Sequence, residues 1–383
     1  MTTSIDDTTH GAGPVPDEPP EPKPSTGARA MRVLPVVAVV VVAVVLAPWS
    51  FNFLRDSEAS RLLVVAVAIA IGVGGVFFMS WAMDRIVDWL PGRWSETMRP
   101  YVFIGPALVT LTVFLVYPVI NTVISSFKDA NGSHFVGLDN YRFVFTDESM
   151  LRSIRNTAGW VILVPLFAVS VGLLFATLAD RLTRGEAVAK SIIFLPMAIS
   201  FVGAAVTWRL IYAYRPSVFG SQIGLMNGIK QGLGQEPVAW LGERPWNNLL
   251  LMVIMVWIQT GFAMVVLSAA IKAIPDEIIE AARIDGASEF QVFRRIIVPS
   301  ILPTIVVVTT YMVINALKVF DIVFVMGNAE ANGTEVIAER MIRWFFLNGN
   351  EGYGAAIAVV LFVAVIPVMI WNVRRFREQE AIR

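Results

Sequence analysis

Long apolar stretches separated by short polar connections run through this chain from near residue 33 almost to its end. The first covers about 20 residues, and the others lie at roughly 62 to 83, 101 to 127, 156 to 179, 190 to 214, 247 to 271, 303 to 326 and 354 to 373. A helix crosses the hydrocarbon core of a bilayer with about 20 apolar residues, because it rises about 1.5 Å per residue and the core is about 30 Å thick. The pattern therefore predicts eight transmembrane helices.

These stretches are continuously apolar and rich in Leu, Val, Ile and Ala. The strands of a membrane barrel instead alternate apolar and polar residues over about ten positions. The whole chain is 56% hydrophobic and 16% charged, whereas a soluble protein is about 25% charged. We therefore expect an all-α, polytopic membrane protein.

The first part of the chain has a different composition. Residues 1–32 contain six prolines together with Asp, Glu, Gly, Ser and Thr, and almost nothing apolar that could form a core. Such a composition favours disorder. The apolar stretch that follows starts too far from the N-terminus for a typical secretory signal, so we expect it to stay in the membrane. The predicted order is a disordered tail at 1–32 and then two membrane helices within 33–97.

The available side chains exclude several functional classes. Lys plus Arg and Asp plus Glu number 30 each, which leaves no basic surplus for a nucleic acid. The chain has no cysteine, and its two histidines, His10 and His134, lie outside every apolar stretch, so thiol, Ser-His and metal chemistry are poorly supported. No segment reads Gly-x-x-x-x-Gly-Lys-Ser/Thr, the phosphate-binding loop of P-loop ATPases. We therefore predict no catalytic residue, metal ligand or cofactor in this chain, and we expect that it is not an enzyme.

The distribution of Lys and Arg predicts the orientation, since positive residues are retained on the cytoplasmic side. An even number of spans places both termini on the same side. If both are cytoplasmic, seventeen Lys and Arg residues lie inside and eleven outside, with Arg209 and Lys318 inside predicted spans. We therefore expect both termini in the cytoplasm.

The cytoplasmic connection at 274–299 reads as two short helices around a turn. Pro275 suits a first helical position, and the acidic residues after it complement the positive end of the helix dipole. Gly286 can adopt the left-handed conformation that ends a helix, while Ser288 and Gln291 have the spacing of a capping box. On these residues alone, an ordinary polar loop with common caps explains the pattern equally well.

Family resemblance separates the two interpretations. The segment resembles the EAA motif of the membrane permeases of binding-protein-dependent ABC importers, with Val298 where Leu is usual; its motif residues are Glu280, Ala281, Ala282, Gly286, Ile296, Val298 and Pro299. Segments at 135–141, 156–157, 195–197, 257–261 and 274–275 resemble the sugar branch of that family, related to the maltose permease subunit with extra N-terminal spans. The stretches 318–321 and 374–383 look most like alpha-glucoside permeases.

This resemblance implies a type I ABC importer fold, with a six-helix core at 98–383. It implies a second permease subunit, two ATPase subunits that use ATP and Mg, and an extracytoplasmic sugar-binding protein. The segment 274–299 would then be the coupling helix that docks into the ATPase, with its site formed by Glu280, Ala281, Ala282, Asp285 and Gly286. Small alanines permit close approach, and a glycine turn sets the angle between the two helices.

Polar residues inside the predicted spans are candidates for a sugar cavity, because polar groups at membrane depth usually face a cavity or a partner helix. In the seventh span, Asn315, Lys318 and Asp321 are three residues apart and so are expected on one side of a helix. An alternative is a Lys318 to Asp321 pair that neutralises itself while the lysine reaches the outer interface.

Two other spans contribute candidates. Gln259 and Phe262 in the sixth span combine an amide with an aromatic ring, as carbohydrate sites often do. Met197, Ser200 and Phe201 follow a proline in the fifth span, where a loosened backbone exposes polar groups. Packing between helices explains each of these residues as well, and the family resemblance supplies no fixed motif at these positions.

We therefore predict a multi-pass permease of the bacterial cytoplasmic membrane that imports a sugar, of the alpha-glucoside or a related class, by alternating access. An ion-coupled secondary transporter would instead use Lys318 and Asp321 as an ion site. A membrane enzyme acting on lipid-linked sugars would need a set of acidic residues at the membrane surface. Both alternatives leave the EAA segment unexplained.

Overall fold

The computed structural model describes residues 49–50, 52–56, 59–89, 92–216, 218 and 220–380. Within these ranges the regular structure is helical, and the β pairing is limited to an isolated antiparallel bridge between Lys128 and Phe135. The expected all-α class is therefore confirmed for the described part of the chain. The tail at 1–32 and the first predicted span lie outside the described residues.

The chain divides into two compact units, one up to Val116 and one from Tyr117. The first contains helices α2 (Arg61–Trp89), α3 (Gly92–Leu111) and η1 (Thr112–Val116). The second contains α4 (Tyr117–Ser125), α5 (Asp139–Thr146), α6 (Glu148–Asp180), α7 (Glu186–Phe194), η2 (Leu195–Ala198), α8 (Phe201–Ile211), α9 (Leu225–Gly232), α10 (Trp246–Lys272), α11 (Asp276–Ile284), α12 (Glu289–Val292), η4 (Phe293–Ile297), α13 (Val298–Ser300), α14 (Leu302–Leu317), α15 (Asp321–Met326), α16 (Ala329–Asn332), α17 (Ile337–Ile342), η5 (Arg343–Leu347) and α18 (Glu351–Glu380).

Five helices of the described residues are long and apolar enough to cross a membrane: Arg61–Arg85, Ala107–Ser125, Glu148–Asp180, Trp246–Lys272 and Glu351–Trp371. Two bent pairs, Glu186–Ala198 with Phe201–Ile211 and Glu289–Ser300 with Leu302–Leu317, raise the number to seven if each pair is one span. These helices and pairs overlap the seven predicted stretches that lie within the described ranges.

Both bends occur next to prolines. The chain turns by 99° between η2 and α8, just after Pro196, and Ser200 restarts the helix by accepting a hydrogen bond from the backbone N–H of Gly203 at 3.1 Å. It turns by 68° at Ile301, before Pro303. Proline removes a backbone donor and crowds the preceding turn, so a helix ends or bends there.

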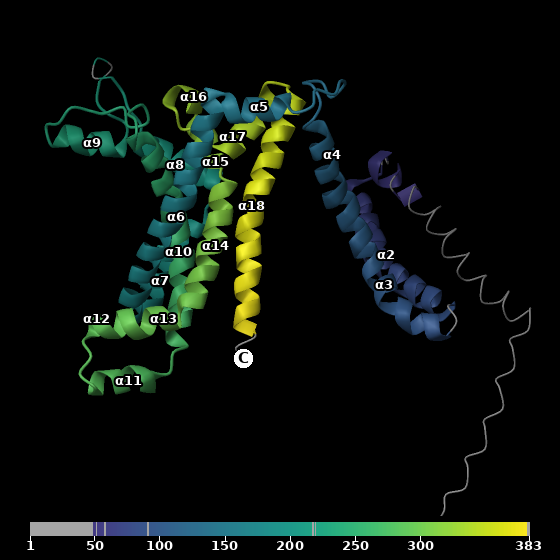
Figure 1. Cartoon of the computed structure of the whole chain (residues 1–383), viewed down its shortest axis with the longest axis horizontal. Coiled ribbons are helices and arrows are strands. Elements are labelled where there is room, and N and C mark those ends of the chain that lie inside the picture. The colour runs from purple at the N-terminus through teal and green to yellow at the C-terminus, as the bar shows by residue number, and fades with distance from the viewer. Residues whose placement is uncertain are drawn as a thin grey trace, which may run out of the picture. The chain divides into compact units, whose positions relative to one another are not determined.

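Small residues bring α10 close to α6 and to α7 in the second unit. A side chain at Gly172 of α6 would collide with Ala263 of α10, and a Cβ at Gly261 would lie 2.6 Å from the carbonyl oxygen of Ile193. Membrane helices associate through such close backbone approach, because lipid offers no hydrophobic drive between them. Figure 1 shows α6, α10 and α14 side by side, and these three helices pack against one another.

The second unit has two distinct ends. Helices α11, α12 and α13 lie at one end, whereas α5, α9, α16 and α17 lie at the other (Figure 1). The described end of α18 lies on the same side as α11 (Figure 1). After the roles predicted from the sequence, we call the end with α11 the coupling end and the opposite one the outer end.

The seventh predicted span is not one helix. Helix α14 ends at Leu317, where the backbone N–H of Lys318 bonds to the carbonyl of Asn315 at 3.2 Å, and α15 starts only at Asp321. The expectation that Asn315, Lys318 and Asp321 share one helical face was therefore wrong. Continuous hydrophobicity predicted the length of the apolar segment, but it carries no signal for this local end.

Candidate functional site

The segment with the EAA-like sequence forms two short helices joined by a glycine turn, as predicted. Helix α11 starts directly after Pro275, which is the residue before the helix rather than its first position. Gly286 has φ +83°. Its backbone N–H donates to the carbonyl of Arg283, and the backbone N–H of Ala287 donates to the carbonyl of Ala282, each at 3.0 Å. These paired bonds form a Schellman motif, in which a left-handed residue closes the helix.

The second helix begins with the predicted capping box. The side chain of Ser288 accepts from the backbone N–H of Gln291 at 3.4 Å, and the Gln291 side chain accepts from the backbone N–H of Ser288 at 2.8 Å. This reciprocal pair satisfies two backbone donors that would otherwise lack a partner. The turn therefore has a defined geometry that comes from local sequence alone.

The segment 274–299, which we call the coupling segment after its predicted role, presents an exposed surface. Four of its residues are exposed, namely Glu280, Ala281, Asp285 and Gly286, and Ala282 is half-buried. Three apolar side chains are exposed beside them: Ile278 is 49% exposed, Ile284 86% and Phe290 68%. A cluster of exposed apolar side chains among charged ones is typical of a surface that binds another protein.

Ion pairs attach this turn to the transmembrane bundle. Glu289 of α12 pairs with Arg283 of α11 at 2.9 Å and with Arg181, which follows α6, at 3.2 Å. Each partner is more than half exposed, so the contribution to stability is modest, about 0 to 1 kcal/mol per pair. Their geometric effect is to tie both short helices to the end of α6.

Two of the candidate cavity residues, Gln259 and Phe262, lie on α10. Gln259 is 2% exposed, and its Nε2 has no hydrogen-bond partner among the described residues. Phe262 packs on Tyr311 of α14, with ring centroids 4.6 Å apart. A buried amide donor without a partner costs about 1 to 3 kcal/mol, so Gln259 is suited to meet a ligand or a water molecule.

The polar residues predicted for the seventh span, Asn315, Lys318 and Asp321, are more dispersed than expected. The Asn315 side chain donates to the carbonyl of Tyr311 at 2.8 Å, one turn earlier in the same helix. Lys318 is exposed at the end of α14, and Asp321 is half-buried at the start of α15. No ion pair joins Lys318 and Asp321 in the described structure.

The residues around the first bend have separate environments. Met197 lies half-buried in η2, and Ser200 is exposed and caps α8. Phe201 packs against the apolar cluster that contains Trp160 and Met255, and Trp257 packs against the same cluster. The bend thus supplies one exposed hydroxyl, while the aromatic ring at 201 serves mainly in packing.

Comparison with known proteins assigns this architecture. The family described as "Binding-protein-dependent transport system inner membrane component" matches residues 161–375. The osmoprotective compounds uptake permease protein GgtC of Synechocystis sp. is 54% identical over 74% of this chain and 100% of its own length. The alpha-glucoside transport system permease protein AglF of Rhizobium meliloti is 47% identical over 82% of this chain and 97% of its own. The chain belongs to this family of transport permeases.

The fold of the permease agrees with that assignment. A solved bacterial ABC transporter involved in the import of the acidic polysaccharide alginate matches 75% of the permease and 99% of the solved chain, with a TM-score of 0.65 and 23% identity. The trehalose/maltose transport system permease protein MalF of Thermococcus litoralis is 32% identical over 74% of the permease. These relatives are transport subunits, which favours the importer prediction over the secondary transporter and the membrane enzyme.

One polar network at the coupling end was not anticipated from the sequence. Lys190 of α7 contacts Asp180 of α6 at 2.6 Å and Ser268 of α10 at 2.5 Å, and it also pairs with Glu186 at 2.6 Å. Lys272 joins the same carboxylate of Glu186. Only the Glu186 to Lys190 spacing of four residues was visible as a helical pair, because the other contacts depend on how three helices meet.

Buried charges at the outer end were also not anticipated. Glu335 and Glu339 are fully buried, and Arg340 is 3% exposed. Arg343 pairs with Glu339 at 2.7 Å, and Arg152 of α6 approaches Glu335 to 3.7 Å. Burial raises the pKa of Glu335, whose carboxylate oxygens accept no hydrogen bond among the described residues. These residues lie between the predicted spans at 303 to 326 and 354 to 373, in a connection expected outside the membrane, and loops rarely bury charge.

Proposed function

We propose that this permease imports α-linked glucosides or related oligosaccharides. The observation that carries the substrate class is the 47% identity to a protein named as an alpha-glucoside transport permease, over 82% of this chain. A relative named for trehalose and maltose, both of which are α-linked glucose disaccharides, adds support.

We further propose that the permease works in a complex with a second permease subunit, two ATPase subunits and an extracytoplasmic sugar-binding protein. ATP and Mg are used by the ATPase subunits, and this chain holds no cofactor. The complex lies in the bacterial cytoplasmic membrane, with both termini of the permease in the cytoplasm. The arrangement of the second unit supports this topology, since the described end of α18 lies on the same side as α11 (Figure 1).

In this proposal the coupling segment docks into the ATPase. Ile278, Ile284 and Phe290 bury their exposed apolar surface there, and each large apolar side chain that leaves water contributes about 1.5 to 3 kcal/mol. Closure of the ATPase pushes the turn at Gly286, and the ion pairs of Glu289 carry the displacement to the end of α6. The helices that line the path then alternate between inward and outward exposure.

The proposed sugar path runs beside α10. Gln259 offers an unpaired amide donor, and the ring of Phe262 offers an apolar face to a sugar ring. The candidate set is completed by Asn315 in α14, by Lys318 and Asp321 after it, and by Met197, Ser200 and Phe201 around the bend. Of these, Gln259 has the strongest physical support, because burial leaves its donor no other partner in the described chain.

The test is transport by the complete complex. The permease is co-expressed with the other subunits from its own host, purified, and placed in proteoliposomes with radiolabelled trehalose, maltose and sucrose. We expect ATP-dependent uptake of at least one of them that requires the loaded binding protein. Uptake that persists without ATP and collapses with a protonophore would contradict the importer mechanism. ATP-dependent transport of a different class of compound would contradict the substrate class.

A further inference from the structure

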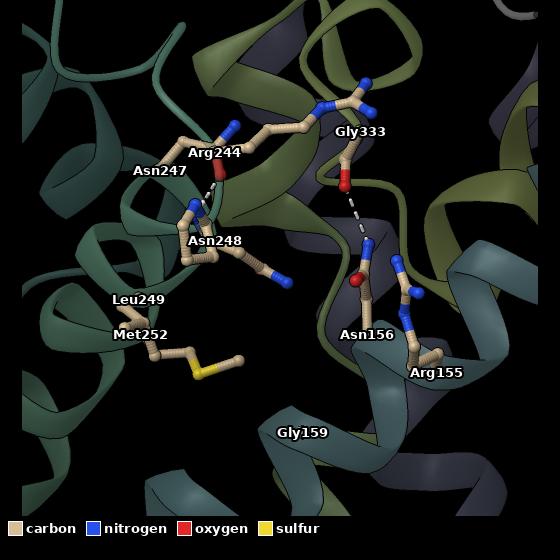
Figure 2. A pocket seen from close by; sticks show the side chains of 10 residues that line it. Arg155, Asn156, Gly159, Arg244, Asn247, Asn248, Leu249, Met252 and Gly333 are labelled. Carbon is tan, nitrogen blue, oxygen red and sulfur yellow. Dashed lines mark hydrogen bonds between the residues drawn. The ribbon is translucent and has the colours of Figure 1, made fainter.

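A polar pocket at the outer end of the permease has no role in the proposed sugar path. Its volume is about 460 Å³, and it lies between α6, the start of α10 and the loop at Gly333. Pockets of about 300 to 1,000 Å³ accommodate small-molecule ligands. Figure 2 shows side chains from α6 and α10 on opposite walls, with Met252 beneath them.

One wall presents a hydrogen-bond acceptor. Asn156 of α6 is 8% exposed, and its Nδ2 donates to the carbonyls of Gly333 and Glu335, at 2.9 Å each. These two bonds identify the nitrogen and fix the orientation of the amide. Its Oδ1 accepts no hydrogen bond from any described residue, so this oxygen stays available on the pocket wall.

The opposite wall presents a donor. The Oδ1 of Asn248 on α10 accepts from the indole N–H of Trp160 at 2.9 Å, and Trp160 is fully buried. The amide is therefore held by a fixed side chain. Its Nδ2 donates to nothing within the described part of the chain, and Asn248 extends from α10 into the space that separates it from Asn156 (Figure 2).

An acceptor on one wall and a donor on the other match a carbohydrate better than an anion. A sugar hydroxyl both donates and accepts, so neighbouring hydroxyls can bond to Asn156 Oδ1 and Asn248 Nδ2 together. A bare anion would be repelled by the Asn156 oxygen. Met252 and Gly159 supply an apolar, unobstructed floor, and the exposed guanidinium of Arg155 adds donors at the rim. Both amides are already oriented, which reduces the entropy cost of binding.

We propose that this pocket is an outer subsite that binds hydroxyl groups of the sugar before it reaches the path beside α10. The inference rests on the proposed function, because it takes the transported sugar as the ligand. It adds a site on α6, a helix that contributes no residue to the candidate sugar path.

The first test substitution changes the side-chain amide of Asn248 to a carboxylate. Asn248→Asp keeps an oxygen for the indole of Trp160 and removes the Nδ2 donor. Asn348→Asp makes the same chemical change at an exposed residue of another outer loop and serves as the matched control. A second pair fills the floor: Gly159→Leu occupies the pocket, whereas Gly159→Ala adds only a Cβ at ordinary contact distance, 3.4 Å from Met252.

Each variant is measured as the complete complex in proteoliposomes with radiolabelled trehalose, maltose and sucrose. Uptake per ATP hydrolysed and the affinity of the complex for its binding protein are both recorded. We expect Asn248→Asp and Gly159→Leu to lower uptake per ATP roughly two- to tenfold, the range for one lost hydrogen bond. Binding-protein affinity should stay unchanged, and both control variants should behave as the unmodified permease.

Two outcomes would overturn the proposal. Normal uptake by Asn248→Asp together with normal uptake by Gly159→Leu means that the sugar does not use the pocket. Weaker docking of the binding protein, with and without sugar, means that the pocket seats a protein side chain instead. If the unmodified complex transports none of the three sugars, the proposed function fails as well. The two failures are therefore distinguishable.

Discussion

At Gly286, one backbone angle determines the direction of the coupling turn. Its φ of +83° lies in the left-handed region, where a β-branched side chain collides with its own backbone. Nothing lies within 4 Å of a Cβ built at this position, so the strain of a substitution is conformational rather than steric. We expect Gly286→Val to distort the turn while the transmembrane helices still insert.

The measurements for this variant are membrane insertion, co-purification of the ATPase and sugar uptake. Gly286→Val should lose ATPase association or its stimulation by the loaded binding protein. Gly286→Ala should be milder, because a non-glycine residue in this region costs about 1 to 2 kcal/mol. Normal uptake by the valine variant would rule out the coupling assignment, whereas failure to insert would assign the glycine a role in folding.

The two candidate amides of the sugar path have different environments. Gln259 has an unpaired buried donor, whereas Asn315 already donates to Tyr311 within its own helix. We expect both Gln259→Ala and Asn315→Ala to lower sugar uptake with assembly intact, since one hydrogen bond is worth about 0.5 to 1.5 kcal/mol. The structure predicts the larger effect for Gln259. Unchanged uptake across a range of sugar concentrations in both variants would remove them from the site.

Sequence was informative at the residue scale wherever the interaction is local. The left-handed Gly286 and the capping box of Ser288 and Gln291 depend on residues at most a few positions apart, and both were predicted. The unpaired donor of Gln259 was not predictable. It depends on which atoms of other helices surround this side chain, and hydrophobicity along one helix carries no such information.

Among the elements, α17 and the residues just before it contain three buried charged side chains, those of Glu335, Glu339 and Arg340. Burial raises the pKa of Glu335 above its ordinary value near 4.5, and this effect outweighs the opposing attraction of Arg152 and Arg340. A carboxyl with a raised folded-state pKa stabilises the fold less when it ionises. The stability of this region should therefore fall as pH rises from the ordinary pKa through the folded one.

Substitution of Glu335 tests the predicted dependence of stability on pH. We expect Glu335→Gln to raise the thermal stability of the solubilised permease at pH 7.5 by about 1 kcal/mol, because it removes a buried charge without hydrogen bonds. The advantage should shrink at pH 4. Glu330→Gln is the control, since Glu330 is 62% exposed and forms an ion pair with Arg340 at 3.4 Å. Destabilisation by Glu335→Gln at pH 7.5 would show that its pairing with Arg152 dominates.

The hydrophobic pattern predicted the lengths of the long membrane-spanning helices, but it did not predict where a span is interrupted. Helices α6, α10 and α18 cover their predicted apolar stretches, because burial in lipid requires an unbroken run of apolar residues. The end of α14 at Leu317 went unpredicted, since neither proline nor glycine marks it. The network of Asp180, Lys190 and Ser268 joins three helices, and a single helix shows only one part of it.

At the scale of the whole molecule, the permease has no phosphate-binding loop. We expect the purified chain alone neither to bind nor to hydrolyse ATP, and the complete complex to hydrolyse ATP faster when its loaded binding protein is added. Nucleotide binding by the single chain, measured by equilibrium dialysis with labelled ATP, would contradict the assignment of ATP hydrolysis to another subunit. A complex with an inactive ATPase subunit controls for contaminating activity.

The topology can be tested without any preparatory mutation, because the natural chain has no cysteine. Single cysteines are placed at Ser4 in the N-terminal tail, at Thr183 between α6 and α7, and at Asn348 after η5. Thr183 and Asn348 are exposed. With eight spans and both termini cytoplasmic, a membrane-impermeant maleimide added to intact cells should label Asn348→Cys alone. Opening the cells should make Ser4→Cys and Thr183→Cys reactive as well.

The pattern of labelling separates the possible errors. An odd number of predicted spans separates Thr183 from Asn348 along the chain, so the two residues should lie on opposite sides of the membrane. Labelling of both in intact cells would contradict the span assignment of the second unit. Labelling of Ser4→Cys together with Asn348→Cys, but not Thr183→Cys, would place the N-terminus outside. The chain between Ser4 and the start of α6 would then cross the membrane an even number of times, whereas the predicted topology requires an odd number. Sugar uptake by each variant confirms that the labelled protein is folded.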